Sequence, residues 1–251
     1  AVIKDVAFAG KFDIDNENDN KTGRRMGIVA GLNSGTLENI GVELTDDSTI
    51  KPKDISNGDG LRLGGVVGGN EGTIVQGHLP ENQNNEENAR ETQDENKSSI
   101  KPKITFYSGK YKIKIDASVL EEVKDENLIK VRVGGLVGRN QGDIIKTSEN
   151  DGLGYANYMA YTNIEVINQE SESINIGDDI GGLVGVSENG SIYSENETHP
   201  IIVGGRLSGN YAVGGIAGKI AVKENDQFKN ITSRTFVKGS YYVGGISAKV
   251  N

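Results

Sequence analysis

The stretch Gly65-Val66-Val67-Gly68-Gly69-Asn70-Glu71-Gly72 joins a glycine, an aliphatic pair, two further glycines and an Asn-x-Gly turn. A close copy, Gly135-Leu136-Val137-Gly138-Arg139-Asn140-Gln141-Gly142, follows later in the chain. An earlier copy runs Gly27-Ile28-Val29-Ala30-Gly31-Leu32-Asn33-Ser34-Gly35. Self-similarity of this kind is typical of a stacked array of repeats, not of a chain folded once around a central core.

Three further copies of this phrase are less complete. Gly182-Leu183-Val184-Gly185 keeps a displaced Asn189-Gly190 turn, whereas Gly215-Ile216-Ala217-Gly218 and Gly245-Ile246-Ser247-Ala248 lack the turn. The shortest spacing between equivalent glycines, 30 residues from Gly215 to Gly245, predicts the basic unit, and longer spacings indicate insertions. The residues expected to define the repeat are Gly31, Asn33, Gly35, Gly65, Gly68, Asn70, Gly72, Gly135, Gly138, Asn140, Gly142, Gly182, Gly185, Gly215, Gly218 and Gly245.

The composition and the pattern around each phrase favour β-structure. Hydrophobic residues make up 35% of the chain and aromatic residues 6%, which is little for one deep globular core. β-Branched residues alternate before and after each phrase, as in Val131-Arg132-Val133 and Thr73-Ile74-Val75, and glycines separate these runs. The sequence therefore predicts an all-β fold, a right-handed β-solenoid of about six repeats that forms one elongated domain over residues 1–251.

The phrase has a clear physical role in such a fold. Paired glycines allow a corner between two short strands, and Asn-x-Gly allows a left-handed turn. If the repeats stack at about 4.8 Å, Asn33, Asn70 and Asn140 lie above one another and are expected to form a hydrogen-bonded ladder. An inward row of aliphatic residues should stack in the same way, and it comprises Ile28, Val66, Leu136, Leu183 and Ile216.

Two insertions interrupt the repeats, at about residues 80–115 and 152–172. The first begins with the acidic segment Pro80–Ser99, which has no aliphatic residue beyond Ala89 and is expected to be a solvated loop. It continues through residues 100–115 as a hairpin or an extra repeat around Ser108-Gly109. The second insertion holds the densest aromatic residues of the chain, Tyr155, Tyr158 and Tyr161, which are candidate ligand contacts.

Charge and composition exclude several classes of partner and chemistry. The net charge of −9 argues against nucleic acid and against an anionic membrane surface as partners. The absence of cysteine excludes disulfides, thiolate metal sites and cysteine nucleophiles. No apolar run is long enough for a membrane span, so direct membrane insertion is not expected. Both ends of the sequence look cut, which predicts a fragment of a larger secreted protein with neighbouring domains in the same chain.

The repeated phrase resembles the GLUG motif, on the residues Gly135-Leu136-Val137-Gly138-Arg139-Asn140-Gln141-Gly142 and their copies. The lead-in Asn210-Tyr211-Ala212-Val213-Gly214 is similar to the usual approach to such a repeat. GLUG repeats occur in Gram-positive surface adhesins and in the non-catalytic region of secreted IgA-specific zinc metalloproteases. The resemblance implies an extracellular protein at the cell surface or in the cell wall that has a host protein or glycan as partner.

The candidate sites for catalysis and metal binding are few. A zincin would need H-E-x-x-H, but His78 and His199 lie far apart, so no catalytic residue is expected in this chain. Paired acids at Asp46-Asp47 and Asp178-Asp179 are expected to be charged turn residues. One acidic segment places oxygen ligands at alternate positions, as a weak calcium loop does, although a solvated turn is the alternative. Its candidate ligands are Asp13, Asp15, Glu17 and Asp19.

These observations predict a non-catalytic extracellular stalk or recognition module of a bacterial adhesin, with no cofactor except weakly bound calcium. The alternative is an accessory domain that positions the substrate of a secreted IgA-type zinc metalloprotease. A polysaccharide-processing β-helix is a third alternative, because paired carboxylates on a β-helix can cleave glycosidic bonds.

Overall fold

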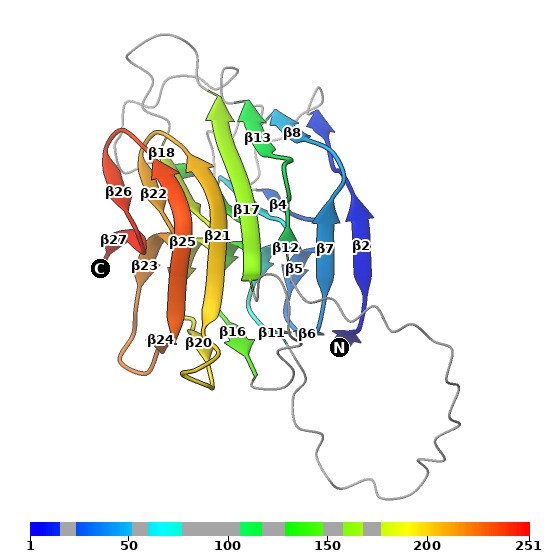
Figure 1. Ribbon diagram of the computed structural model, residues 1–251, viewed down its shortest axis with the longest axis vertical. Helices are drawn as coiled ribbons and strands as arrows, with labels where there is room; N and C mark the ends of the chain where they lie inside the picture. Colours follow the sequence, from blue (N-terminus) through cyan, green and yellow to red (C-terminus); the bar gives the residue numbers. More distant parts are fainter. Residues whose placement is uncertain (16–23, 52–59, 77–105, 117–128, 148–157, 168–176) are drawn as a thin grey trace, which may run out of the picture.

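The computed structural model describes residues 1–15, 24–51, 60–76, 106–116, 129–147, 158–167 and 177–251 (Figure 1). These residues form 27 short strands and no helix, so the described chain is all-β. The strands belong to four sheets, and every pairing between strands is parallel. Parallel pairing brings together strands that are distant in the sequence, as a repeated chain path requires.

Three of the sheets contain six strands each, one from every repeat. Sheet 1 consists of β1 (Val2–Lys4), β6 (Thr36–Glu38), β11 (Thr73–Gln76), β16 (Asp143–Lys146), β20 (Ile192–Ser194) and β24 (Phe228–Lys229). Sheet 3 consists of β4 (Arg24–Gly27), β9 (Leu61–Gly64), β14 (Ile129–Gly134), β18 (Gly177–Gly181), β22 (Ala212–Gly214) and β26 (Tyr242–Gly244). Sheet 4 consists of β5 (Ala30–Asn33), β10 (Val67–Asn70), β15 (Val137–Asn140), β19 (Val184–Glu188), β23 (Ala217–Ala221) and β27 (Ser247–Val250).

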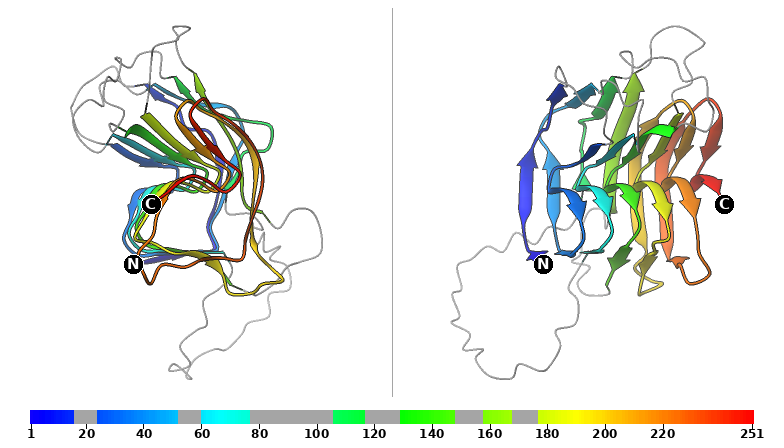
Figure 2. Two further views of the ribbon diagram at one scale, coloured as in Figure 1. Left: turned by 90° about the vertical axis from the view of Figure 1, so that its left-hand side faces the viewer. Right: turned by 180° about the vertical axis from the view of Figure 1, so that it is seen from behind.

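Sheet 2 has nine strands because its first three repeats use two short strands where the last three use one long strand. The short strands are β2 (Ala7–Gly10), β3 (Ile14–Asp15), β7 (Gly41–Leu44), β8 (Ser48–Lys51), β12 (Phe106–Tyr107) and β13 (Ile113–Asp116). The long strands are β17 (Tyr158–Ile167), β21 (Ile201–Ser208) and β25 (Ile231–Lys238). β17 pairs with both β12 and β13, and thereby joins the two halves of the sheet. In the left view of Figure 2, equivalent strands of successive repeats lie over one another.

The register between repeats is set by the glycine phrase. One row runs through Gly27, Gly64, Gly134, Gly181, Gly214 and Gly244. Because Gly27 pairs with Gly64, the equivalent of Val66 in the first repeat is Val29, whose backbone N–H donates to Val66 O at 3.0 Å. The expected place of Ile28 in the aliphatic row is therefore wrong by one residue. Ile28 takes the position of Gly65 instead.

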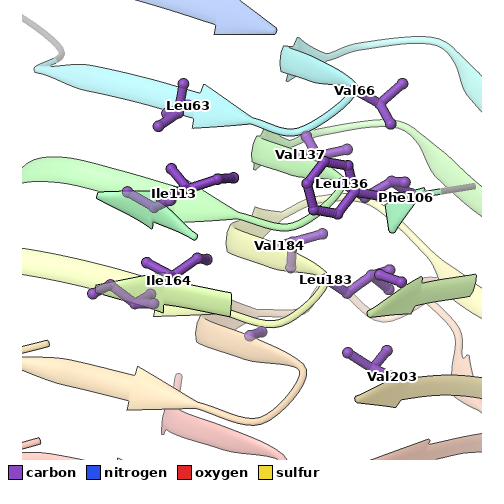
Figure 3. Close-up of a cluster of buried hydrophobic side chains, with 14 of the residues drawn as sticks. Leu63, Val66, Phe106, Ile113, Leu136, Val137, Ile164, Leu183, Val184 and Val203 are labelled. Atoms are coloured by element: carbon purple, nitrogen blue, oxygen red, sulfur yellow. The ribbon is translucent and has the colours of Figure 1, made fainter. Parts of the chain in front are cut away.

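The aliphatic side chains of these rows fill the interior. Leu63, Val66, Leu136 and Leu183 are fully buried, and Figure 3 shows Val66, Leu136 and Leu183 one below the other in successive repeats. Sheet 2 completes the core with Phe106, Ile113, Ile164 and Val203, which point toward the same rows. Each strand buries a narrow stripe, which explains how a chain with few hydrophobic residues builds a continuous core.

The predicted asparagine ladder is present at the end of sheet 4. Asn33 Nδ2 donates to Asn70 Oδ1 at 2.7 Å, and Asn70 Nδ2 donates to Asn140 Oδ1 at 2.8 Å. Asn140 Nδ2 then donates to Ser187 Oγ at 3.2 Å. The ladder satisfies polar side chains that would otherwise be costly to bury.

The prediction of a left-handed turn is wrong for the three complete Asn-x-Gly copies. None of Gly35, Gly72 and Gly142 has a positive φ. Glycine is needed there for close approach, because a Cβ on Gly72 would lie 2.1 Å from Gly35 O, and one on Gly142 would lie 2.0 Å from Gly72 O. In the fourth copy the left-handed residue is Asn189, in the displaced Asn189-Gly190 turn, and other left-handed residues are Asp5, Asn39 and Asn230.

Both predicted insertions contribute regular strands to sheet 2. β12 and β13 do not pair with each other as a hairpin, because each pairs in parallel with strands of the neighbouring repeats. β17 occupies residues that the sequence assigned to the second insertion. The acidic segment at residues 80–99 lies outside the described residues.

Candidate functional site

The outer face of sheet 2 gathers three tyrosines, of which the sequence pointed to two. Tyr158 and Tyr161 both lie on β17, with ring centroids 5.5 Å apart in an edge-to-face arrangement. Strict alternation would place residues three apart on opposite faces of a strand. A register shift between Tyr158 and Ala160 in the pairing with β21 turns both rings to the same side. Tyr155, the third predicted contact, lies outside the described residues.

The third ring comes from the neighbouring strand. Tyr107 on β12 is the register partner of Tyr161, and their ring centroids are 5.7 Å apart. Tyr107 is 38% exposed, so the group presents a ring to solvent. Sequence reasoning missed Tyr107 because its position beside Tyr161 depends on pairing between distant strands. We call Tyr107, Tyr158 and Tyr161 the tyrosine platform.

A glycine on the opposite side of β17 makes room for the tyrosine platform. Gly204 on β21 is the register partner of Tyr161. A Cβ on Gly204 would lie 2.7 Å from Tyr158 Cε1 and 3.1 Å from Tyr161 Cδ2. A side chain at this position would therefore push the rings away from the sheet.

A groove of about 450 Å³ continues from Tyr161 along the same face. Lys112 Nζ and Glu165 Oε2 form an ion pair at 2.9 Å in its wall. The guanidinium of Arg206 lies over the ring of Phe236, 5.7 Å from its centroid. The lining residues are Gly109, Lys110, Lys112, Tyr161, Asn163, Ile164, Glu165, Arg206, Leu207, Ser208, Phe236 and Lys238.

The floor of the groove is fixed by Asn163. Its Nδ2 donates to the backbone oxygens of Gly109 and Tyr111, at 2.9 and 3.1 Å, and its Oδ1 accepts from the backbone N–H of Arg206 at 3.0 Å. Ser108 Oγ donates to Tyr161 O at 3.0 Å and accepts from the Asn163 N–H at 3.0 Å. These bonds join the loop between β12 and β13 to β17 and β21, so the groove is largely preformed, as ligand sites usually are.

The groove has the opposite charge to the chain as a whole. The sequence carries a net charge of −9, whereas the groove is lined by Lys110, Lys112, Arg206 and Lys238 against the single acid Glu165. Aromatic rings beside such cations suit a ligand that has flat apolar surfaces and negative groups. Acidic sugars and acidic protein segments both have this chemistry.

Asp178 and Asp179 are buried strand residues, so the prediction of charged turn residues is wrong for them. Asp178 accepts from the backbone N–H groups of Asn210, Tyr211 and Ala212, at 2.8, 2.5 and 3.2 Å, and so holds the turn between β21 and β22. Burial raises the pKa of Asp178 to about 6 although these three donors favour the charged form. With its oxygens occupied by backbone donors, Asp178 has a structural role.

Asp179 lies beside Arg132 in the register of sheet 3. Burial raises the pKa of Asp179 to about 7, and the nearby charges of Arg132, Lys249 and Lys219 oppose this rise. Perturbed carboxyl groups often mark functional sites. Asp179, however, is on sheet 3, and the described groove is lined by residues of sheet 2 and its loops.

Of the four predicted calcium ligands, the structure describes only the side chain of Asp13. Asp13 is engaged in an ion pair with Lys11 at 2.9 Å and accepts from the Thr49 N–H at 2.9 Å, and the hydrogen bond with Lys11 lowers the pKa of Asp13. Glu17 and Asp19, together with the side chain of Asp15, lie outside the described residues. In the part of the chain that the structure describes, no group of three or more acids and histidines could hold a metal ion.

The other acids and histidines that the sequence singled out are surface residues or lie outside the described residues. Asp47 pairs with Lys114 at 2.6 Å, and the hydrogen bond with Lys114 lowers the pKa of Asp47. His199 Nδ1 lies 3.0 Å from Thr198 Oγ1 in the loop before β21. His78 is not among the described residues.

The comparisons with known proteins identify no relative. No family model, no curated protein and no solved structure matches this chain. Within the described residues no helix could cross a membrane, since none is long and apolar enough.

Proposed function

We propose that this chain is a non-catalytic recognition module of a bacterial cell-surface adhesin, and that it binds its ligand on the outer face of sheet 2. The observation that carries the proposal is the tyrosine platform beside a preformed, cation-lined groove. Aromatic rings beside a preformed groove are typical of binding surfaces. The resemblance of the repeats to the GLUG motif supports an extracellular location at the cell surface or in the cell wall.

The proposal also includes how the repeats are arranged in space. The four sheets would be the faces of a right-handed β-solenoid in which each repeat makes one turn. Its support is the glycine row, which passes in register through all six repeats, and the parallel pairing of every strand. A stiff rod of this kind holds one binding face away from the cell wall and presents it to a host surface.

The ligand class follows from the lining of the groove. Tyr161 and Phe236 would stack on the flat faces of sugar rings or on aromatic side chains. Lys112, Arg206 and Lys238 would pair with carboxylate or sulfate groups. We therefore propose an acidic host glycan, or an acidic segment of a host protein, as the ligand.

The test is binding of the purified chain to immobilised mucin, matrix proteins and immunoglobulin A, with calcium and with a chelator. We expect saturable binding to one of these surfaces that weakens as salt rises, because charge pairing contributes to it. Tyr161→Ala should weaken this binding by about tenfold or more, the loss expected for a central aromatic contact. Immunoglobulin A as the one bound surface would favour an accessory domain of a protease.

Tyr193→Ala provides the matched control. Tyr193 lies on β20 in sheet 1, where Lys229 Nζ lies 5.6 Å from its ring centroid, so it is an aromatic residue beside a cation on another face. The proposal predicts unchanged binding in this variant. If no surface binds the chain, or if Tyr193→Ala and Tyr161→Ala weaken binding equally, sheet 2 is not the binding face.

A further inference from the structure

Glu165 is the single acid among the described side chains that line the groove of sheet 2. In the register of the sheet it lies between Lys114 on β13 and Ser208 on β21. Its Oε2 accepts a hydrogen bond from Lys112 Nζ at 2.9 Å, and the side chains of Lys112 and Glu165 are 47% and 40% exposed. An ion pair of this exposure contributes little to the stability of a fold. Glu165 is therefore accessible to a ligand, and its Oε1 can accept a further hydrogen bond.

Arg206 is held beside this acid. Ser208, the register partner of Glu165, lies two residues after Arg206, so Glu165 and Arg206 are on the same face of sheet 2 and on neighbouring strands. The backbone N–H of Arg206 donates to Asn163, and its guanidinium lies over the ring of Phe236. Within the described residues no acid forms an ion pair with Arg206. A planar guanidinium that is oriented by a ring suits a carboxylate bound through both of its oxygens.

The groove runs across the strands of sheet 2, not along them. Its lining residues come from the loop before β13 and from β17, β21 and β25, which belong to four successive repeats. At about 4.8 Å between neighbouring strands, these elements span about 14 Å. β17 pairs with β12 and β13 on one side and with β21 on the other, so its backbone offers no open edge to which a peptide strand could add. A short chain of sugars fits a groove of this length, and it binds through its rings, hydroxyls and charged groups alone.

The proposed function of sheet 2 is the basis for a narrower assignment of its ligand. We propose that the groove binds a linear glycan in which a carboxylated sugar alternates with a neutral sugar, and that Glu165 selects this ligand. Arg206 pairs with the carboxylate, Tyr161 stacks on a sugar ring, and Glu165 accepts hydrogen bonds from hydroxyls of the neutral sugar. A sulfate on the neutral sugar, or the adjacent carboxylates of an acidic protein segment, would bring a second negative group against Glu165. Like charges held together disfavour binding, so both of these ligands are rejected.

The first test compares matched probes on the whole chain. Chondroitin oligosaccharides, in which glucuronic acid alternates with a neutral sugar, are used in sulfated and desulfated forms of equal length, together with a polyglutamate peptide. We expect the desulfated form to bind more tightly than the sulfated form and the peptide by about tenfold or more, measured by titration calorimetry at fixed salt. Equal or tighter binding of the sulfated form would show that charge alone determines affinity. Equal or tighter binding of the peptide would identify an acidic protein segment as the ligand, and either result overturns the proposal.

Glu165→Gln tests the selecting residue. The amide keeps the size of the side chain, but it removes the charge that repels sulfate and releases Lys112 to pair with sulfate. We expect the preference for the desulfated form to fall by about tenfold or more. Glu188→Gln is the matched control, because Glu188 forms an ion pair with Arg139 at 2.6 Å on sheet 4 and its replacement changes the net charge equally. An unchanged preference in Glu165→Gln, or an equal fall in Glu188→Gln, would contradict the selection by Glu165.

Arg206→Lys tests the carboxylate contact. Lysine keeps the positive charge but loses the planar fork, so binding of the desulfated form should weaken by about fivefold or more. Normal binding in this variant would overturn the role of Arg206. If the chain binds mucin, matrix proteins or immunoglobulin A through Tyr161 but binds neither form of the glycan, the glycan assignment is overturned and the proposed function stands. If it binds none of these surfaces, the proposed function fails as well.

Discussion

Each buried asparagine of the ladder uses both ends of its amide. Asn70 accepts from Asn33 Nδ2, and its own Nδ2 donates to Asn140 Oδ1 and to Gly72 O. One side chain therefore connects three successive repeats, and no shorter polar side chain could reach both neighbours. These side-chain bonds fix the position of each repeat relative to its neighbours, because the rows of aliphatic side chains alone would tolerate a shift of one repeat along the next.

Replacing Asn70 with alanine should destabilise the chain by about 2–4 kcal/mol, because it leaves Asn140 Oδ1 without its donor and removes the acceptor of Asn33 Nδ2. Urea unfolding followed by far-UV circular dichroism measures this loss. Asn33→Ala, at the end of the ladder, breaks one bond between ladder side chains, whereas Asn70→Ala breaks two, so Asn33→Ala should cost less. Equal losses in the two variants would mean that the ladder does not act as a connected row.

The buried carboxyl groups predict a dependence of stability on pH. The pKa of Asp178 is raised to about 6 and that of Asp179 to about 7, from 3.8, so the folded state holds these protons more tightly than the unfolded state. Their contribution to stability is therefore greatest in acid and falls as pH rises from about 4 to about 7. At about 1.36 kcal/mol per pKa unit, Asp179 accounts for a fall of up to roughly 4 kcal/mol.

Asp179→Asn isolates this effect. The free energy of unfolding is measured across this pH range for the unaltered protein and for Asp179→Asn. The other carboxyl groups titrate equally in both proteins, so the difference between the two curves reports on Asp179. We expect the stability of the variant, in which Arg132, Lys219 and Lys249 face a neutral amide, to depend less on pH. Parallel curves for the two proteins would show that Asp179 is ionised throughout.

The strands of the glycine phrases are the elements that sequence reasoning located well. β10, β15 and β19 follow directly from their glycines and alternating aliphatic residues, since both signals are local. β12, β13 and β17 carry no phrase, and their sequences alone indicate insertions. Their place in sheet 2 depends on pairing with distant strands, and the register shift in β17 that turns Tyr158 outward has no local signal. The tyrosine platform could therefore be predicted only in part.

A substitution at Gly204 tests how the strands position the tyrosine platform. Gly204→Val should displace the Tyr158 and Tyr161 rings, because its Cβ would lie 2.7 Å from Tyr158 Cε1. The ring ends can move, so we expect less than about 1 kcal/mol of lost stability. Near-ultraviolet circular dichroism should report the altered rings, and ligand binding should fall as in Tyr161→Ala. An unchanged spectrum with unchanged binding would show that Gly204 does not support the rings.

At the scale of the whole molecule, stability should vary along the stack of repeats. Interior repeats are covered on both sides, whereas the first and last are covered on one, and stacked repeats gain stability mainly from their neighbours. Asp178 supports this coupling, because a side chain of the fourth repeat holds three backbone N–H groups of the fifth. Local unfolding should therefore begin in the first and last repeats and spread to the interior repeats. The asparagine ladder and Asp178 should oppose this spread.

Amide hydrogen exchange measured at low protein concentration tests this gradient. At low concentration, amides of β26 and β27 should exchange about tenfold or more faster than those of β14 and β15, because end repeats open with less free energy. Uniform exchange along the stack would contradict the gradient.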